Sequence, residues 1–208
     1  MKSSFTLSLT LGSFLFLAAA LSAQTDFSAV MTNSWGGTPQ TYKIFVSGDK
    51  VRVESVPAAG SAPSILDMTS RVTRVVVAEK KTYMQGPPGV SLQRGYALFR
   101  APDVENACDL WLKLVFRSGS ACHKIGSAEL NGRKAIEYEG KSSEGDPSHV
   151  WIDTKLAFPL KWDSKGGGGA LRDIQEGPQP AALFEIPPDF TKINGFSTTH
   201  HMSDMSAH

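Results

Sequence analysis

The sequence has little cysteine, and this scarcity limits the roles that its thiols can play. Its 208 residues include two cysteines, Cys108 and Cys122, whose spacing is not that of a Cys-x-x-Cys motif. A redox pair or a metal site is therefore the weaker interpretation, because no other cysteine is present to complete such a site. The favoured interpretation is one structural disulfide, which requires an oxidising compartment.

The chain also lacks an excess of charge of either sign. It carries 21 lysine and arginine residues against 20 aspartate and glutamate residues. Residues 1–23 include Lys2 and no acidic residue, so their removal leaves 20 basic and 20 acidic residues. Nucleic-acid-binding proteins normally carry a basic excess or stripe. We therefore expect no nucleic-acid partner and no electrostatic attachment to an anionic membrane.

Sequence motifs of common enzymes are missing as well. The chain contains no G-x-S-x-G, no Walker loop, no dinucleotide-binding glycine motif and no H-E-x-x-H. Before the C-terminal tail its histidines are His123 and His149, and a lone histidine is seldom a catalyst. Glu137 and Glu139 would share one face of a strand, as an acid–base pair requires, but a solvated strand face explains them as well. We predict that the protein is not an enzyme and binds no cofactor.

Long apolar runs are absent except at the N-terminus. Lys2 precedes an apolar stretch from Phe5 to Leu21, and small residues follow it up to Ala23. This order is typical of a secretory signal peptide over 1–23, although an uncleaved membrane anchor is the alternative. No later segment is long and apolar enough to span a bilayer, so we expect no stable span after cleavage. The predicted location is the periplasm or the exterior.

Export favours oxidation of the two thiols. A Cys108–Cys122 bridge would close a loop of about fifteen residues and stabilise the fold by about 3 kcal/mol in the chain-entropy model. We predict this bridge in the mature protein.

The rest of the chain, from 24 to 196, is predicted to be a single domain rich in β-strands. Ser47-Gly48-Asp49-Lys50 and Asn131-Gly132 supply hairpin turns between alternating apolar and polar runs. We expect antiparallel meanders before and after a central helix, with Gly166–Gly169 as a flexible loop. The expected strands cover 27–35, 42–46, 51–55, 65–68, 72–77, 82–85, 124–130, 134–139, 149–153, 159–162 and 171–175.

The central helix is expected in the segment DVENACDLWLKLVFRSG, residues 103–119. Asp103 is a suitable N-cap, and apolar residues from Leu110 to Val115 recur at helical spacing. Gly119 can occupy the position after the last turn. Because Cys108 lies in this helix and Cys122 just beyond it, the bridge would attach the helix to the following strand.

The C-terminal tail, residues 197–208, is polar and predicted to be disordered. It contains histidine and methionine side chains that copper accepts as ligands, among them His200, His201 and His208. They are weak candidates, because a disordered end can carry such residues without function, and no metal site is predicted.

Aromatic and large apolar residues are distributed over many of the expected strands and the helix. They fit either a filled sheet core or a curved sheet with an apolar cavity on its concave face, and alternation does not separate the two. Under the second interpretation the candidate ligand-binding residues are Trp35, Phe45, Leu110, Trp111, Leu114, Trp151 and Trp162.

Three stretches of the chain resemble a known family. They are TYKIFVSGDKVRVES (41–55), HVWIDTKLAFPLKWD (149–163) and LFEIPPDFTKI (183–193). Together with the order of elements, they are similar to the LolA-like (outer-membrane lipoprotein carrier) superfamily, particularly its exported branch of unknown function. The resemblance implies an α+β fold in which a curved antiparallel β-sheet forms a half-open barrel with a helix covering one face. It also implies a closing Phe-x-Ile-Pro strand and binding of acyl chains or other lipids.

The chain departs from this family in having one clear helix and in bridging it by a disulfide. We predict an exported binding protein for a hydrophobic ligand, a lipid or a lipoprotein acyl chain, in the cell envelope. The alternative is an envelope interaction or structural module with a filled core, whose partner is another envelope protein.

Overall fold

The computed structural model describes residues 25–34, 38–57, 62–88, 98–115, 121–142 and 145–194. In these residues a twelve-stranded sheet accompanies one α-helix, α1 (Cys108–Val115), and two short 3-10 helices, η1 (Ala78–Lys80) and η2 (Ala181–Phe184). The strands are β1 (Phe27–Asn33), β2 (Gln40–Ser47), β3 (Lys50–Val56), β4 (Ser64–Asp67), β5 (Val72–Val77), β6 (Thr82–Gln85), β7 (Ala121–Leu130), β8 (Arg133–Lys141), β9 (Pro147–Asp153), β10 (Pro159–Ser164), β11 (Gly167–Glu176) and β12 (Thr191–Lys192).

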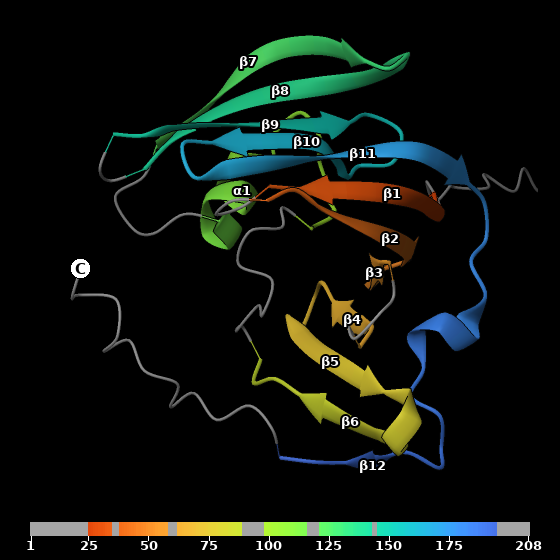
Figure 1. Ribbon diagram of the computed structural model, residues 1–208. Helices are drawn as coiled ribbons and strands as arrows, with labels where there is room; N and C mark the ends of the chain where they lie inside the picture. Colours follow the sequence, from red (N-terminus) through yellow and green to blue (C-terminus); the bar gives the residue numbers. More distant parts are fainter. Residues whose placement is uncertain are drawn as a thin grey trace, which may run out of the picture.

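The sheet consists of two antiparallel meanders joined in its middle. Its strand order is β12-β6-β5-β4-β3-β2-β1-β11-β10-β9-β8-β7, so β1 pairs with β2 on one side and with β11 on the other. The edges are β7 and β12, and the sheet bends around α1 without closing (Figure 1). The expected α+β fold, a curved sheet in the form of a half-open barrel with a helix on one face, is confirmed.

The hairpins form where turn residues interrupt the alternating pattern. Asn131 and Gly132 both have positive φ, 51° and 77°, which is the backbone of a type I′ turn and joins β7 to β8. Gly48, also with positive φ, lies in the turn between β2 and β3. Both hairpins confirm the sequence-based prediction.

The concave face of the sheet carries one continuous apolar core. In β1 every second residue from Phe27 to Asn33 is buried, and Ile44 and Val46 continue the same face on β2. Trp111 of α1 belongs to this core with 2% of its surface exposed. The core beneath the helix is therefore largely filled by side chains.

The helix begins later than the sequence predicts. Asp103 is not its N-cap, because its carboxylate accepts hydrogen bonds from the backbone of Glu105 and the side chain of Asn106 in a separate turn. The first helical residue is Cys108, and the bridge to Cys122 attaches α1 to β7 with a Cα–Cα distance of 5.6 Å. The disulfide prediction is confirmed, and Gly119 lies outside the described residues.

The prediction of a flexible loop at Gly166–Gly169 is wrong. Gly167, Gly168 and Gly169 are not a loop but the first residues of β11. A Cβ on Gly169 would come within 2.3 Å of the Trp162 ring and within 2.6 Å of the Thr32 carbonyl oxygen. Gly168, whose Cβ would be 2.5 Å from the Trp162 carbonyl oxygen, and Gly169 are therefore required by close packing between strands.

The expected closing strand is not formed by the Phe-x-Ile-Pro residues. Phe184 ends η2, which packs near β3, where Arg52 donates a hydrogen bond to the Leu183 carbonyl. The chain then adds β12 in parallel to β6 at the sheet edge. The two prolines after Ile186 explain the interruption, because proline cannot donate to a strand ladder.

Arg100 connects three segments of the chain that lie outside the regular strands. Its buried guanidinium donates to the backbone carbonyls of Gly48 at 2.8 Å, Leu156 at 2.8 Å and Thr25 at 3.0 Å. Asp26 supplies a counter-charge at 3.8 Å. One side chain therefore holds the start of the domain, the β2–β3 turn and the β9–β10 loop together.

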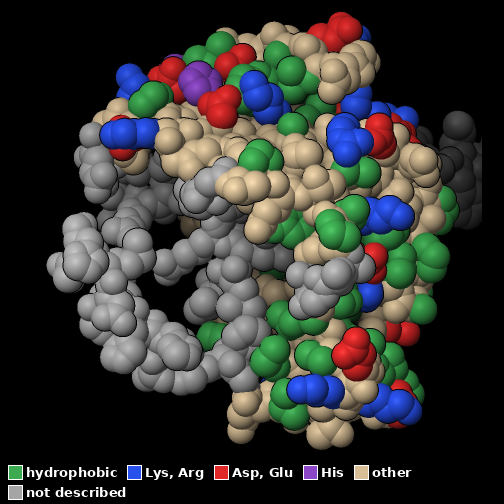
Figure 2. Space-filling model, in the orientation of Figure 1, with side chains coloured by type: hydrophobic (Ala, Val, Ile, Leu, Met, Phe, Trp, Pro, Cys, Tyr) green, Lys and Arg blue, Asp and Glu red, His purple; other side chains and the backbone are tan. Residues whose placement is uncertain are grey.

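The predicted signal peptide (1–23) and the predicted disordered tail (197–208) lie outside the described residues and remain predictions. Within the described ranges, no helix is long and apolar enough to cross a membrane. Figure 2 shows basic and acidic side chains interspersed over the visible face. That mixture agrees with the near balance of charges in the sequence.

Candidate functional site

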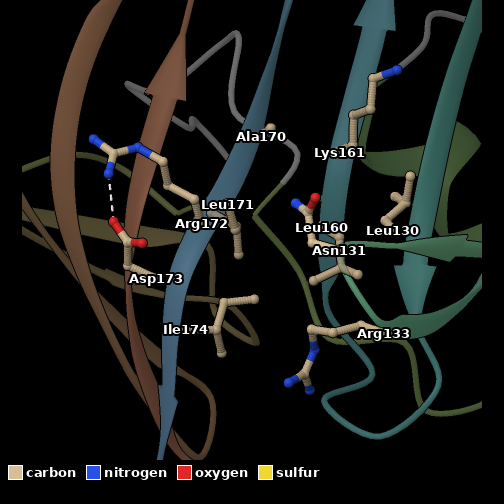
Figure 3. A pocket seen from close by; sticks show the side chains of 10 residues that line it. All are labelled: Leu130, Asn131, Arg133, Leu160, Lys161, Ala170, Leu171, Arg172, Asp173 and Ile174. Atoms are coloured by element: carbon tan, nitrogen blue, oxygen red, sulfur yellow. Dashed lines mark hydrogen bonds and ion pairs between the residues drawn. The ribbon is translucent and has the colours of Figure 1, made fainter.

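A cleft opens where β10 and β11 separate. The two strands pair from Lys161–Ser164 to Gly167–Ala170 and no further. Beyond Ala170, β11 continues along β1, while β10 follows β9. The resulting cleft has a volume of about 390 Å³, and side chains from four strands and a turn surround it (Figure 3).

The cleft combines an apolar lining with charged and polar residues at its rim. Leu160 and Leu171 are buried core residues, and Leu130 and Ile174 are partly buried against the same core. Figure 3 shows Leu171 and Ile174 beside the ribbon of β11 and Leu160 beside that of β10, with Leu130 on the other side of β10. The remaining lining residues are Ala170 and, as polar members, Asn131, Arg133, Lys161, Arg172 and Asp173.

A β-bulge shapes one wall of the cleft. Ser28 pairs with Gln175 and Val30 with Arg172, so two residues of β11 lie opposite Ala29 of β1. Asp173, with φ of 53°, is one of the two. The extra residue shifts which side chains of β11 face the core, and it increases the local twist of the strand. Both effects change the direction of the neighbouring side chains. Ile174 is partly buried against the core as a result.

An ion-pair network closes one end of the cleft. Arg133 donates to Asp153 at 2.5 Å and to Glu176 at 2.8 Å, and thus connects β8, β9 and β11. Lys155 also pairs with Glu176. Hydrogen bonds from Lys155 and Arg133 lower the pKa of the Glu176 carboxyl below its ordinary value. This network fixes the position of the β7–β8 turn over the cleft.

The other cations of the rim also have partners. Arg172 pairs with Asp173, and the ammonium group of Lys161 lies 4.2 Å from the centre of the Trp151 ring and 3.7 Å from Asp163. These pairs are solvent-exposed, so each contributes little stability and is easily rearranged. A ligand head group could therefore recruit either cation at small cost.

One wall of the cleft is a strand edge. From Leu171 to Glu176, β11 has a strand partner in β1, and no second strand pairs with this segment among the described residues. Backbone groups on such an edge are available to hydrogen-bond a ligand or an added strand. The cleft therefore offers apolar, cationic and backbone contacts together.

The residues predicted from the sequence as ligand-binding lie elsewhere. Trp111 and Trp162 are in the main core, and Leu110 and Leu114 pack against it from α1. Phe45 alternates with buried neighbours on β2 and thus faces the opposite side of the sheet.

Trp151, also predicted as ligand-binding, is partly buried on β9, while Trp35 lies outside the described residues. The structure brings Trp111 and Trp162 into one core cluster, but none of the six described members of the predicted set lines the cleft. Their role in ligand binding stays a prediction.

The cleft residues were missed because the features that assemble them are not local. The Asn-Gly turn is visible in the sequence and places Leu130 at a strand end. The separation of β10 from β11 and the bulge at Asp173 have no distinct sequence pattern, because Asp173 lies between ordinary strand residues. The one signal in the sequence is a mismatch in length: between the paired positions, β11 has one residue more than β1.

Glu137 and Glu139 share a face of β8 as predicted, and His149 of β9, which is paired with Glu139, lies near both. The His149 Nδ1 atom is 3.1 Å from Glu137, and its Nε2 atom is 3.8 Å from Glu139. His149 stacks on Trp151 with a ring-centre distance of 5.7 Å. All three ion-pairing side chains are partly exposed, as on a solvated sheet face.

In the part of the chain that the structure describes, no group of three histidine, cysteine or acidic side chains is arranged to hold a metal ion. The weak candidates His200, His201 and His208 lie outside that part.

Comparison with known proteins yields likeness of fold. No family model matches the sequence, and no curated protein matches it significantly. An uncharacterized conserved protein from Thermus thermophilus is 13% identical, with a TM-score of 0.50 over 84% of this chain and 93% of that chain.

Two further structural matches are more distant. A MucA/MucB complex structure from Pseudomonas aeruginosa is 15% identical over 78% of this chain and 56% of that chain, with a TM-score of 0.42. A LolA superfamily protein from Nitrosomonas europaea is 8% identical over 78% of this chain and 90% of that chain, with a TM-score of 0.33. A protein of the superfamily that the sequence resembles is thus among the matches.

Proposed function

We propose that this protein is an exported binding protein of the cell envelope and that it holds a hydrophobic ligand in the cleft between β10 and β11. The observation that carries the proposal is an open cavity of about 390 Å³ with four large aliphatic side chains in its lining. Export is supported by the N-terminal sequence pattern and by the Cys108–Cys122 bridge, which fits an oxidising compartment such as the periplasm. The proposal assigns no catalytic chemistry to the cleft.

The cleft suits a ligand with an apolar chain and an anionic head. Its volume lies near the lower end of the usual range for small-molecule pockets, about 300–1,000 Å³. Burying six methylene groups against Leu130, Leu160 and Ile174 would contribute about 5 kcal/mol before the costs of association. Lys161 and Arg172 at the rim would interact with the head group. We therefore expect micromolar or weaker affinity for a single fatty-acid chain.

A second candidate function is attachment of a partner protein in the envelope. The observation that favours it is the edge of β11 between Leu171 and Glu176, which pairs with β1 on one side. An extended segment of a partner could add to this edge as a strand, with apolar side chains entering the cleft. The filled core beneath α1 agrees with this candidate, because it does not require a cavity there.

The test is a calorimetric titration of dodecanoate, below its micelle concentration, into the oxidised protein. We expect a saturable heat and a melting temperature that rises with dodecanoate concentration, as mass action requires of native-state binding. Ala170→Phe, which fills the cleft, should abolish both effects. Ala128→Phe introduces the same side chain on β7, away from the cleft lining, and should leave both effects in place.

Absence of a saturable heat and of a thermal shift in the unmodified protein would reject the ligand function. The partner function would then be tested with a photo-crosslinking residue in place of Asp173, an exposed position at the rim. It predicts one defined envelope protein crosslinked at this position in cells. The same label at Asp109, exposed on α1, should not capture that protein. Equal capture from both positions would reject the partner function at the cleft.

A further inference from the structure

The two edges of the sheet differ in how they are protected from pairing with another strand. β12 has two residues, and very short edge strands are one means by which native proteins prevent edge-to-edge association. β7 has ten residues, none of them proline, so its backbone can continue a hydrogen-bonded ladder. Figure 1 shows β7 as the outermost strand, and among the described residues it pairs with β8 and with no second strand.

β7 also buries none of its side chains. Every residue from Ala121 to Leu130 is at least partly exposed, whereas β11, which has the same length, buries Leu171. Ile125 of β7 has 51% of its surface exposed, more than any other large hydrophobic residue of the described ranges. A long exposed edge strand of this kind is a template for pairing with another chain.

The charges of β7 are arranged so that the strand complements itself. Lys124 lies before the β-bulge at Ile125, and Glu129 lies after it. Their partners on β8, Tyr138 and Lys134, are four residues apart, so Lys124 and Glu129 face the same side of the sheet. Two copies of β7 in antiparallel register would place Lys124 of each copy near Glu129 of the other. A parallel register would align like charges, which is destabilising.

The bulge fits the same antiparallel arrangement. With a two-fold axis between Ile125 and Gly126, the bulge of one copy lies opposite that of the other, so both strands bend at the same point. Ile125 of each copy then lies beside Gly126 of the other. The space beside Gly126 is open, because a Cβ on this glycine would meet no atom within 4 Å. Ser127 of each copy lies opposite Lys124 of the other, and Glu129 is its diagonal neighbour, within reach of a long side chain.

We propose that two copies of this chain associate along β7, in antiparallel register about a two-fold axis between Ile125 and Gly126. The sheet then continues from one copy into the other, through an interface that uses the same residues on both. Lys124 already pairs with Glu105, but both side chains are exposed, so this ion pair contributes little and is readily exchanged. Because a single strand edge buries a small area, the dimer forms reversibly, at micromolar concentrations and above.

The test is sedimentation equilibrium of the oxidised protein over a wide range of micromolar concentrations. We expect a monomer–dimer equilibrium. Lys124→Glu and Glu129→Lys each place like charges across the axis and should each weaken the dimer by about tenfold. An equimolar mixture of the two variants should restore association, because one copy is then acidic at both positions and the other is basic at both. Lys124 and Glu129 are exposed, so neither variant removes a buried contact.

Two further variants complete the design. Lys192→Glu makes the same change of charge on β12, at the opposite edge of the sheet, and should leave the dimer unchanged. Ala170→Phe, which fills the cleft, should also leave it unchanged, so the dimer and the proposed ligand function fail separately. A protein that stays monomeric at every concentration would overturn the proposal. So would a dimer that Lys124→Glu and Glu129→Lys do not weaken, or one that their mixture does not restore.

Discussion

Substitution of Gly169 by alanine tests the packing that joins the two halves of the sheet. The added Cβ would meet the Trp162 ring at 2.3 Å on one side and the Thr32 carbonyl oxygen at 2.6 Å on the other. Real contacts of this kind are essentially never below 3.0 Å. Moving the ring disturbs the core, and moving Thr32 disturbs the β1–β11 ladder. We expect Gly169→Ala to lower the free energy of unfolding by about 3 kcal/mol, at the upper end of typical overpacking costs.

The assay is a urea titration of the oxidised protein, with Gly132→Ala as the matched control. Gly132 has φ of 77°, and no atom lies within 4 Å of the place that a Cβ would take, so its substitution costs backbone strain alone, about 1 kcal/mol. Trp162→Phe removes part of the ring that the methyl group of Gly169→Ala would strike. The double variant should therefore lose less stability than the sum of its single variants, by about 1–2 kcal/mol.

Two results would refute this reasoning. One is a cost of Gly169→Ala no greater than that of Gly132→Ala. The other is strict additivity with Trp162→Phe, which would mean that the ring and the new methyl group do not compete for space.

Three further predictions concern the elements that hold the fold together. Reduction of the Cys108–Cys122 bridge, which spans a sequence separation of 14, should lower the unfolding free energy by about 3 kcal/mol, and a melting temperature unchanged by reductant would contradict this. Arg100→Met leaves the backbone carbonyls of Gly48, Thr25 and the buried Leu156 without their donor and should cost about 3 kcal/mol in a urea titration, whereas a near-neutral effect would show that these carbonyls find other partners. Because the folded-state pKa of Glu176 is lowered, its stabilising contribution is present above its ordinary value of 4.5 and is lost as the pH falls below it. Arg133→Met should therefore flatten the loss of stability in acid, measured as melting temperature against pH, and an unchanged slope would argue against the network.

Much of the fold follows from local sequence patterns. The Asn131-Gly132 turn requires two residues with positive φ, and this pair is the strongest short-range hairpin signal available. Alternation on β1 places Phe27 and Met31 in the core because successive side chains face opposite sides of a strand. Such features depend on neighbours within a few residues, so the sequence is sufficient to predict them.

The wrong expectations concern features that depend on distant residues. The glycines at 166–169 suggested flexibility, but the small size of Gly168 and Gly169 is required by Trp162, which precedes them on another strand. Asp103 is an exception, because its carboxylate accepts hydrogen bonds from Glu105 and Asn106, two and three residues later, and the helix begins only at Cys108. The short strand β12 depends on β6, from which a long stretch of chain separates it.

The candidate site was the least predictable part. Most of the ligand-binding residues predicted from the sequence are aromatic. Trp111 and Trp162 belong instead to the core, where large apolar side chains contribute most to burial. The cleft is lined by aliphatic residues such as Leu130 and Leu160, whose composition is that of any strand. Their assembly depends on where two strands part, which is a property of the sheet as a whole.

The measurement that tests the central claim most directly is the location of a bound amphiphile by paramagnetic relaxation. A fatty acid with a nitroxide near the end of its chain would be added below its micelle concentration to nitrogen-15-labelled protein. We predict that amide signals at Leu130, Ala170 and Ile174 broaden first and that unlabelled dodecanoate restores them. Broadening centred on Leu110 and Leu114 of α1, or spread evenly over the surface, would contradict binding in the cleft between β10 and β11.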